Sequence, residues 1–264
     1  MKIIISPAKQ MGEEREFLVP RGRPLYESRA EELAAYLRSL PYPELRRLLA
    51  CSEALARAAY KTYQTMELQR ADTPALLAYR GIQYQYMAPQ VFEETYFDYV
   101  QEHLRILSGL YGILRPLDAV MPYRLEMQAK VRFGPWRDLY HFWGDSLYRA
   151  LTDDGDRVIL NLASREYSRV IEPWLTGADT FVTCTFGELQ GEKVIEKGVY
   201  VKMARGEMVR WMAEHAVERP EDLRQFDRLG FSYCPDRSRP EQLVFLMGQR
   251  PGSARRTGRD VSIV

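Results

Sequence analysis

Short apolar runs alternate along this chain with longer segments of helical periodicity, and this alternation constrains the fold more than any other feature. The first run, the isoleucines at positions 3–5, ends at Ser6 and Pro7 and predicts a buried strand over residues 2–5. Further strands are predicted at residues 76–79, 158–162, 180–186, 194–201, 231–234 and 243–247, and helices at residues 26–40, 45–66, 92–104, 143–151 and 202–216. The expected fold class is therefore mixed α/β, or α+β.

The length and the lack of an internal repeat or Gly/Ser-rich linker predict one compact domain. The chain has 264 residues and a mass of 30.8 kDa, enough to bury a substantial core. We expect a single domain over residues 1–248, with a mixed sheet flanked by helices. Residues 249–264 carry four arginines and few apolar side chains, which predicts a basic, flexible C-terminal tail.

Overall charge and cysteine usage narrow the class of protein. Lys and Arg number 37 against 36 Asp and Glu, so strong global attraction to nucleic acid or to an anionic membrane is excluded. Three cysteines without CxxC spacing argue against disulfides and zinc knuckles, and favour the reducing cytoplasm. No signal-peptide core and no run of about 20 apolar residues is visible, so we expect no membrane partner.

The main internal basic segment spans residues 105–137, where glycines and prolines interrupt short apolar runs. Its candidate phosphate-binding residues are Arg105, Gly109, Gly112, Arg115 and Arg124. Guanidinium groups and exposed backbone amides both donate to phosphate oxygens. The alternative for each arginine is a solvated loop or a structural ion pair. The spacing of the two glycines favours an ordinary tight turn over a DNA-binding helical hairpin.

Polar residues follow two of the predicted strands and suggest a pocket. Ser6 and Lys9 follow the first strand, and Asn161 and Ser164 lie at the end of the strand predicted at 158–162. Ligands gather at the carboxyl ends of strands in α/β proteins. With Tyr123 and Tyr167, these side chains suit a nucleobase or a sugar. The alternative is that Asn161 and Ser164 cap a helix.

Lys202 and Arg205 lie three residues apart at the expected start of a helix. They share one helical face and, together with the helix N-terminus, could hold an anion. A solvated helix end is the alternative. Because the helix macrodipole disfavours cations at an N-terminus, we favour the anion site.

Asp118, Glu126 and Asp145 are the candidates for acid–base catalysis or metal binding, since each lies beside arginine or aromatic residues. The three histidines are isolated from one another, so we predict no histidine-based metal site and no cofactor. No cysteine has the cationic surroundings of a reactive thiol, and a peroxide-reducing thiol mechanism is not expected.

Six blocks of this sequence, in order along the chain, resemble the YaaA peroxide stress protein family. They are ISPAK (5–9), LSGLYGILRPLD (107–118), PYRLEM (122–127), LYHFWGD (139–145), NLASREY (161–167) and KMARG (202–206). The resemblance implies a cytoplasmic bacterial protein with an unusual α/β fold and a positively charged cleft. It also implies DNA binding and protection against hydrogen peroxide and reactive intracellular iron. One departure is Ile82 within YRGIQY (79–84), at a position where family members typically carry an aspartate.

Two functional hypotheses follow, and we favour the first. The first is a DNA-binding protein of the peroxide stress response without sequence specificity, in which the basic segment and the cations at positions 9, 202 and 205 grip phosphates. The second is an enzyme acting on a nucleobase or nucleotide, in which the polar residues bind the base and a carboxylate supplies acid–base chemistry. A third possibility is that the family blocks specify only the fold.

Overall fold

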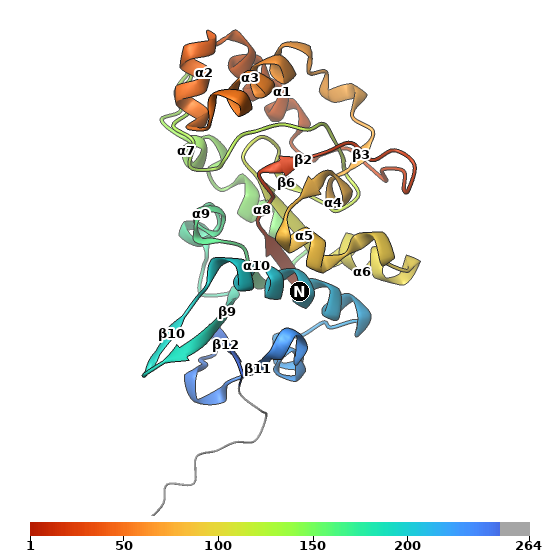
Figure 1. Cartoon of the computed structure of the whole chain (residues 1–264), viewed down its shortest axis with the longest axis vertical. Coiled ribbons are helices and arrows are strands. Elements are labelled where there is room, and N and C mark those ends of the chain that lie inside the picture. The colour runs from red at the N-terminus through yellow and green to blue at the C-terminus, as the bar shows by residue number, and fades with distance from the viewer. Residues whose placement is uncertain (249–264) are drawn as a thin grey trace, which may run out of the picture.

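The strands gather into one central sheet in the computed structural model, which describes residues 1–248 (Figure 1). Along the sheet their order is β11-β12-β9-β8-β1-β5-β6, with β10 paired to β9. Their bounds are β1 (Lys2–Ile5), β5 (Leu104–Ser108), β6 (Gly112–Leu114), β8 (Val158–Leu162), β9 (Thr180–Gln190), β10 (Lys193–Ile195), β11 (Phe231–Tyr233) and β12 (Gln242–Met247). Neighbours from β12 to β5 run parallel, whereas β6, β10 and β11 pair antiparallel. The mixed α/β class expected from the sequence is confirmed.

Strand β1 lies inside this sheet because its side chains are apolar on both faces. Ile3, Ile4 and Ile5 have no exposed surface. Strands buried on both faces are typical of parallel sheets that helices cover on each side. In the register, Ile3 is flanked by Leu104 of β5 and Leu160 of β8.

The chain changes direction across the sheet at β1. From β1 it moves to β5 on one side, then crosses to β8 on the other side and continues outward to β9 and β12. In open α/β sheets, a crevice forms at the carboxyl ends of the strands where the strand order reverses, and ligands bind there. The carboxyl ends of β1 and β8 are that place in this protein.

Helices surround the sheet, and a cluster of three lies at one end of the molecule (Figure 1). The cluster comprises α1 (Glu27–Ser39), α2 (Tyr42–Leu49) and α3 (Glu53–Thr65). The other helices are α4 (Ala75–Ala78), α5 (Ile82–Met87), α6 (Glu94–His103), α7 (Leu139–Trp143), α8 (Ser146–Thr152), α9 (Arg165–Ser168) and α10 (Gly198–Glu214). Two short ladders, β2 (Gln10–Met11) with β4 (Tyr79–Arg80) and β3 (Thr73–Pro74) with β7 (Ala119–Val120), tie the connecting segments together.

Helices α5 and α10 approach each other closely at Gly206. A Cβ atom built on Gly206 would lie 2.0 Å from the backbone oxygen of Gln83, which is closer than any real contact. Glycine is therefore required where the two backbones meet. This contact fixes α10 against the segment that follows β4.

Three predicted elements differ from the structure. The apolar run at 76–79 is mostly the helical turn α4 and not a strand, because a run this short fits either conformation. The helix predicted at 45–66 is two helices, α2 and α3, separated where Ala50 has φ 46°. The strand predicted at 194–201 stops at Ile195, and α10 begins at Gly198.

The early start of α10 also corrects the argument for its two cations. Lys202 and Arg205 lie within the second turn and beyond it, and not at the N-terminus of the helix. The macrodipole effect falls off within the first turn, so it does not support an anion site there. Any anion binding by these residues must come from the side chains themselves.

The predicted basic tail, residues 249–264, lies outside the described residues. Over residues 1–248, no helix has both the length and the apolar character that crossing a membrane requires.

The Gly206 contact gives a test of the packing. Gly206→Ala should lower the free energy of unfolding by about 1–3 kcal/mol, the usual cost of forcing an extra group into a packed interior. Gly198→Ala is the matched control, because nothing lies within 4 Å of a Cβ atom at that position. Urea unfolding of both variants measures the difference. Equal stabilities would contradict the close approach of α5 and α10.

Candidate functional site

A cavity of about 540 Å³ opens at the carboxyl ends of β1 and β8, where the strand order reverses. We call it the carboxyl-edge cavity. Its walls come from residues 6–10, 80–84, 123–126 and 164–167 and from α10. It brings together the predicted residues Ser6, Lys9, Tyr123, Arg124, Glu126, Ser164, Tyr167, Lys202 and Arg205. Segments far apart in the sequence therefore meet at one edge of the sheet.

Two serines link the ends of β1 and β8. The hydroxyl oxygen of Ser6 accepts a hydrogen bond of 2.8 Å from the backbone N–H of Ser164, and the two hydroxyl oxygens lie 3.2 Å apart. Ser164 occupies the N-cap position of α9, yet its side chain makes no capping bond. The Tyr84 hydroxyl donates to the backbone oxygen of Ser6 at 3.0 Å. The serine pair thus forms a fixed polar floor.

Glu126 lies between two cations at the rim of the cavity. Lys9 Nζ is 3.0 Å from Glu126 Oε1, and Arg124 Nη2 is 3.7 Å from the same oxygen. Arg124 also donates to the backbone oxygen of Lys9 at 3.4 Å. The predicted carboxylate at 126 is therefore held by both neighbouring cations.

Within residues 1–248, Arg205 is a cation of the cavity wall without a hydrogen-bond or ion-pair partner, and Lys202 is another. Among residues 1–248, no hydrogen bond or ion pair involves its guanidinium, and its Nε atom is buried. Burial lowers the pKa of Arg205, and the charge of Glu196 opposes that effect. An arginine still stays charged at neutral pH. The cavity wall therefore carries a positive charge that the described protein atoms do not neutralise.

Unsatisfied N–H groups concentrate at this cavity. Within residues 1–248, the buried side-chain polar atoms without a hydrogen-bond partner are Tyr42 Oη, Gln83 Nε2, Arg124 Nε and Arg205 Nε. The last three belong to residues that line the cavity, and all three atoms are N–H donors. Native proteins satisfy nearly all buried polar groups, so such a group calls for an explanation.

Glu166 is a second carboxylate in the cavity, and we did not predict it as a candidate. Its Oε1 accepts from the backbone N–H of Gln128 at 3.3 Å. Burial raises the pKa of Glu166, the Gln128 bond lowers it, and the charge of Glu126 raises it. Its place in the NLASREY block beside Tyr167 was the signal available in the sequence.

Buried tyrosines hold the wall formed by residues 123–126. The Tyr123 hydroxyl lies 2.7 Å from Ser108 Oγ and 3.0 Å from the hydroxyl of Tyr79. Tyr63 donates to the backbone oxygen of Arg124 at 2.8 Å. Burial raises the pKa of Tyr123 to about 12, so its phenol stays protonated and can donate. This network fixes the position of Arg124.

Several predicted residues lie elsewhere. Asn161 is buried, where its Oδ1 accepts from the backbone N–H of Ala163 at 2.9 Å and its Nδ2 donates to Thr183 at 3.2 Å. These bonds shape the turn after β8. Asp145 pairs with Arg149 at 2.5 Å on the surface.

The predicted glycines sit inside the β5–β6 hairpin, so the tight turn favoured above is confirmed. A Cβ atom on Gly109 would lie 2.5 Å from the backbone oxygen of Leu125, and one on Gly112 would lie 2.8 Å from the ring of Trp143. Both glycines serve close packing, and neither lines a cavity described in residues 1–248.

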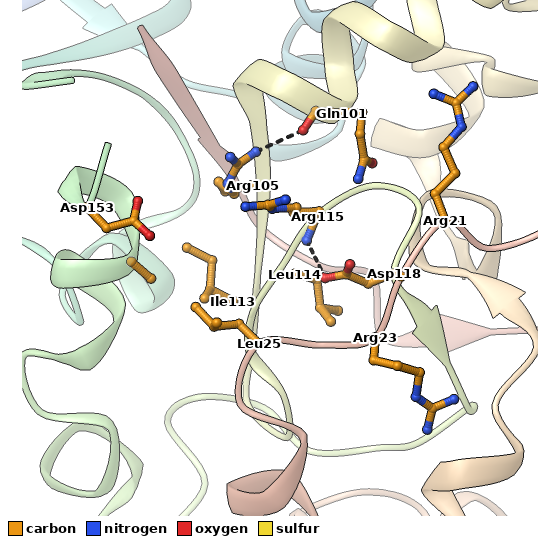
Figure 2. Close-up of a pocket in the computed structure, with 12 residues that line it drawn as sticks. Arg21, Arg23, Leu25, Gln101, Arg105, Ile113, Leu114, Arg115, Asp118 and Asp153 are labelled. Atoms are coloured by element: carbon orange, nitrogen blue, oxygen red, sulfur yellow. Dashed lines mark hydrogen bonds between the residues drawn. The ribbon is translucent and has the colours of Figure 1, made fainter. Parts of the chain in front are cut away.

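Arg105, Arg115 and Asp118 line a different pocket of about 250 Å³ (Figure 2). We call it the amino-edge pocket, because it lies where β5 begins and the antiparallel strand β6 ends. It is therefore at the edge of the sheet opposite to the carboxyl-edge cavity.

Over residues 1–248, no group of three or more His, Cys, Asp and Glu residues could hold a metal ion. Cys184 is buried, and burial raises the pKa of its thiol.

The chain matches known proteins over most of its length. Residues 1–237 match the family described as peroxide stress protein YaaA. A UPF0246 protein of Desulfitobacterium hafniense is 57% identical over 246 residues, which cover 93% of this chain and 98% of the relative. A UPF0246 protein of Lachnoclostridium phytofermentans is 53% identical over 249 residues, covering 94% and 97%.

The pH dependence of stability tests whether the Asp118 carboxyl is buried at the amino edge of the sheet. Burial raises the pKa of this carboxyl from 3.8 to about 6, while the Arg115 backbone N–H opposes the rise. A raised folded-state pKa means that protonation stabilises the fold fully below about pH 4, and that this contribution is lost as the pH rises through about 6.

Asp118→Asn cannot lose a proton, so its free energy of unfolding relative to the wild type should rise by about 2–3 kcal/mol between pH 4 and pH 8. Urea unfolding across that range measures it. The control is Asp145→Asn at the surface ion pair. If the difference in free energy of unfolding between Asp118→Asn and the wild type does not change with pH, the raised pKa assigned to Asp118 is wrong.

Proposed function

The chain belongs to the YaaA peroxide stress protein family, and on this premise we propose that it serves the peroxide stress response by binding DNA, with one nucleotide unit held in the carboxyl-edge cavity. Family membership supports the role in peroxide stress. The observation that carries the proposal is the set of unpartnered N–H donors on Gln83, Arg124 and Arg205. Donors without protein acceptors suit a ligand rich in acceptor oxygens.

The charge of the cavity favours an anion. Among the described lining residues, the cationic side chains are Lys9, Arg80, Arg124, Lys202 and Arg205, against the acids Glu126 and Glu166. The whole chain is nearly neutral, so this excess is local. A concave site lined by one sign of charge attracts the opposite sign more strongly than an open surface does.

The size of the cavity argues for a nucleotide unit and against a whole duplex. A volume of about 540 Å³ lies in the range of small-molecule sites. A duplex major groove is about 12 Å wide and the helix is broader still, so double-stranded DNA would lie across the rim. Lys9 and Lys202 are exposed there and can contact phosphates on either side. Binding would protect DNA in the cytoplasm when peroxide and reactive iron rise.

A second candidate function is an enzyme acting on the nucleobase or nucleotide in that cavity. It is favoured by the two carboxylates, because burial raises the pKa of Glu166 while Glu126 faces the cations Lys9 and Arg124. A carboxyl group with a raised pKa can act as a general acid, and a second carboxylate beside it can act as a general base. Product analysis with nucleosides, nucleotides and lesion-containing DNA would show turnover that Glu166→Gln abolishes.

DNA binding can be tested by fluorescence anisotropy with duplex, single-stranded and gapped DNA at two salt concentrations. We expect binding that weakens steeply with salt, as counterion release requires. Arg205→Gln should weaken binding about tenfold or more, since a charged hydrogen bond contributes about 1.5–3 kcal/mol. Lys202→Gln should reduce the salt slope by about 1.

The matched control for Lys202→Gln is Lys61→Gln, an exposed lysine on α3 that should leave binding unchanged. The proposal is contradicted if the affinity for every DNA form is the same at both salt concentrations. It is also contradicted if Arg205→Gln binds DNA as tightly as the wild type.

Ile82 offers a further test, because it lines the cavity and the family resemblance implies an aspartate at this position. Ile82→Asp adds a negative charge to the wall and should weaken DNA binding several-fold, by roughly 1 kcal/mol for a pair of charges a few ångströms apart in a watery site. Ile82→Asn has nearly the same shape without the charge and should bind more tightly than Ile82→Asp. Equal affinity of the two variants would show that no anion enters this part of the cavity.

A further inference from the structure

The amino-edge pocket is a second cavity, at the edge of the sheet opposite to the carboxyl-edge cavity. Figure 2 shows it between α6, the β5–β6 hairpin and the end of α8. Its volume is about 250 Å³, roughly half that of the other cavity. Its lining includes the exposed Leu25 and the buried Ile113, which add apolar surface, together with several charged groups.

Arg105 brings a buried positive charge to this pocket. Only 8% of the residue is exposed. Its Nη1 donates to the backbone oxygens of Gln101, at 3.2 Å, and Leu104, at 2.8 Å. Over residues 1–248 its guanidinium has no carboxylate within ion-pair distance, and no other nitrogen of the group has a hydrogen-bond partner. The backbone contacts orient the group but do not neutralise it.

Arg115 adds a second positive charge beside the first. The two guanidinium groups lie next to each other in Figure 2. Burial and the charge of Arg115 lower the pKa of Arg105, and the charges of Asp118, Asp154 and Asp153 oppose that effect. In the part of the chain that the structure describes, the Arg115 side chain makes no hydrogen bond or ion pair. Two adjacent like charges repel each other unless an anion lies between them or over them.

Gln101 supplies a neutral donor to the same pocket. Its Oε1 accepts from the backbone N–H of Leu117 at 2.9 Å, which fixes the amide and leaves its two N–H groups available. Arg105, Arg115 and Gln101 come from a strand, a loop and a helix, and they converge on one space.

The other arginines of the pocket are already paired. Arg21 binds Asp98 at 2.6 Å, and Arg23 binds Glu27 and the backbone oxygen of Leu68. Both side chains point away from the pocket centre in Figure 2. The available positive charge is therefore that of Arg105 and Arg115.

Two acids also face the pocket, but neither pairs with these arginines. Asp118 Oδ2 accepts from the backbone N–H of Arg115 at 2.8 Å, and no ion pair within residues 1–248 involves Asp118 or Asp153. Figure 2 shows Asp153 on one side of the arginine pair and Asp118 on the other, and the charges of both acids act on Arg105.

We propose that the amino-edge pocket binds a small oxyanion, the phosphate or carboxylate group of a small molecule, which Arg105, Arg115 and Gln101 hold. The planar guanidinium forks match the spacing of phosphate and carboxylate oxygens. The apolar surface of Leu25 and Ile113 would contact a short hydrocarbon part of the ligand. This site is independent of the proposed DNA function, because it lies at the other edge of the sheet.

Isothermal titration calorimetry of the full chain with inorganic phosphate and with pyrophosphate tests this site. We expect Arg115→Gln to weaken binding about tenfold or more, as loss of a charged hydrogen bond does. Arg115 is exposed, so this variant should fold. Arg21→Gln is the matched control, since Arg21 borders the pocket but pairs with Asp98, and it should bind like the wild type.

Arg205→Gln separates this site from the carboxyl-edge cavity and should retain the binding that Arg115→Gln loses. The proposal is overturned if the wild type binds neither ion, if Arg115→Gln binds as the wild type does, or if only Arg205→Gln reduces binding.

A parallel DNA-binding experiment identifies the source of the oxyanion. If Arg115→Gln also weakens duplex binding, and duplex competes with pyrophosphate, the group bound is a backbone phosphate. If DNA affinity is unchanged while pyrophosphate binding is lost, the ligand is a free small molecule. The first result overturns the assignment to a small molecule, and the second supports it.

Discussion

Parallel pairing on both sides of β1 is the constraint on which the rest of this structure depends. Ile3, Ile4 and Ile5 can be buried on both faces only if helices cover both faces of the sheet. Parallel neighbours force long connections, and these connections carry the chain from β5 across β1 to β8. The polar residues that follow β1 and β8 therefore emerge side by side. The hydrogen bond between Ser6 and Ser164 is a direct consequence.

The sequence predicted those elements whose local pattern and tertiary setting agree. Strands β1 and β8 have the predicted bounds, because each is a short apolar run that a turn signal ends. The strand predicted at residues 76–79 was wrong, because four apolar residues do not distinguish a helical turn from a strand. The start of α10 was missed, because Gly198 opens a helix without any capping side chain.

Much of the carboxyl-edge cavity was predictable, because residues after parallel strands must meet at one edge. The basic segment was harder to interpret. Arg105 lies at the start of β5, and the β5–β6 hairpin reverses the chain, so Arg115 returns to the same amino edge while Arg124 lies at the carboxyl edge. Neighbours in sequence are thus divided between two pockets. Asn161 looked like a ligand-binding group, but the turn after β8 uses its hydrogen bonds. Composition alone contains no information about which edge a side chain reaches.

The contact at Gly206 has a consequence for motion. Because the backbones of α10 and α5 touch there, Ile82, Lys202 and Arg205 belong to one rigid wall of the carboxyl-edge cavity. The opposite wall, at residues 123–126, is tied down by tyrosine hydroxyls. A ligand therefore meets a preformed shape, and little conformational entropy is lost on binding. Selectivity would then arise from the fit of the ligand to fixed donors. The rate of ligand release would be set by breaking those contacts and not by the opening of a lid.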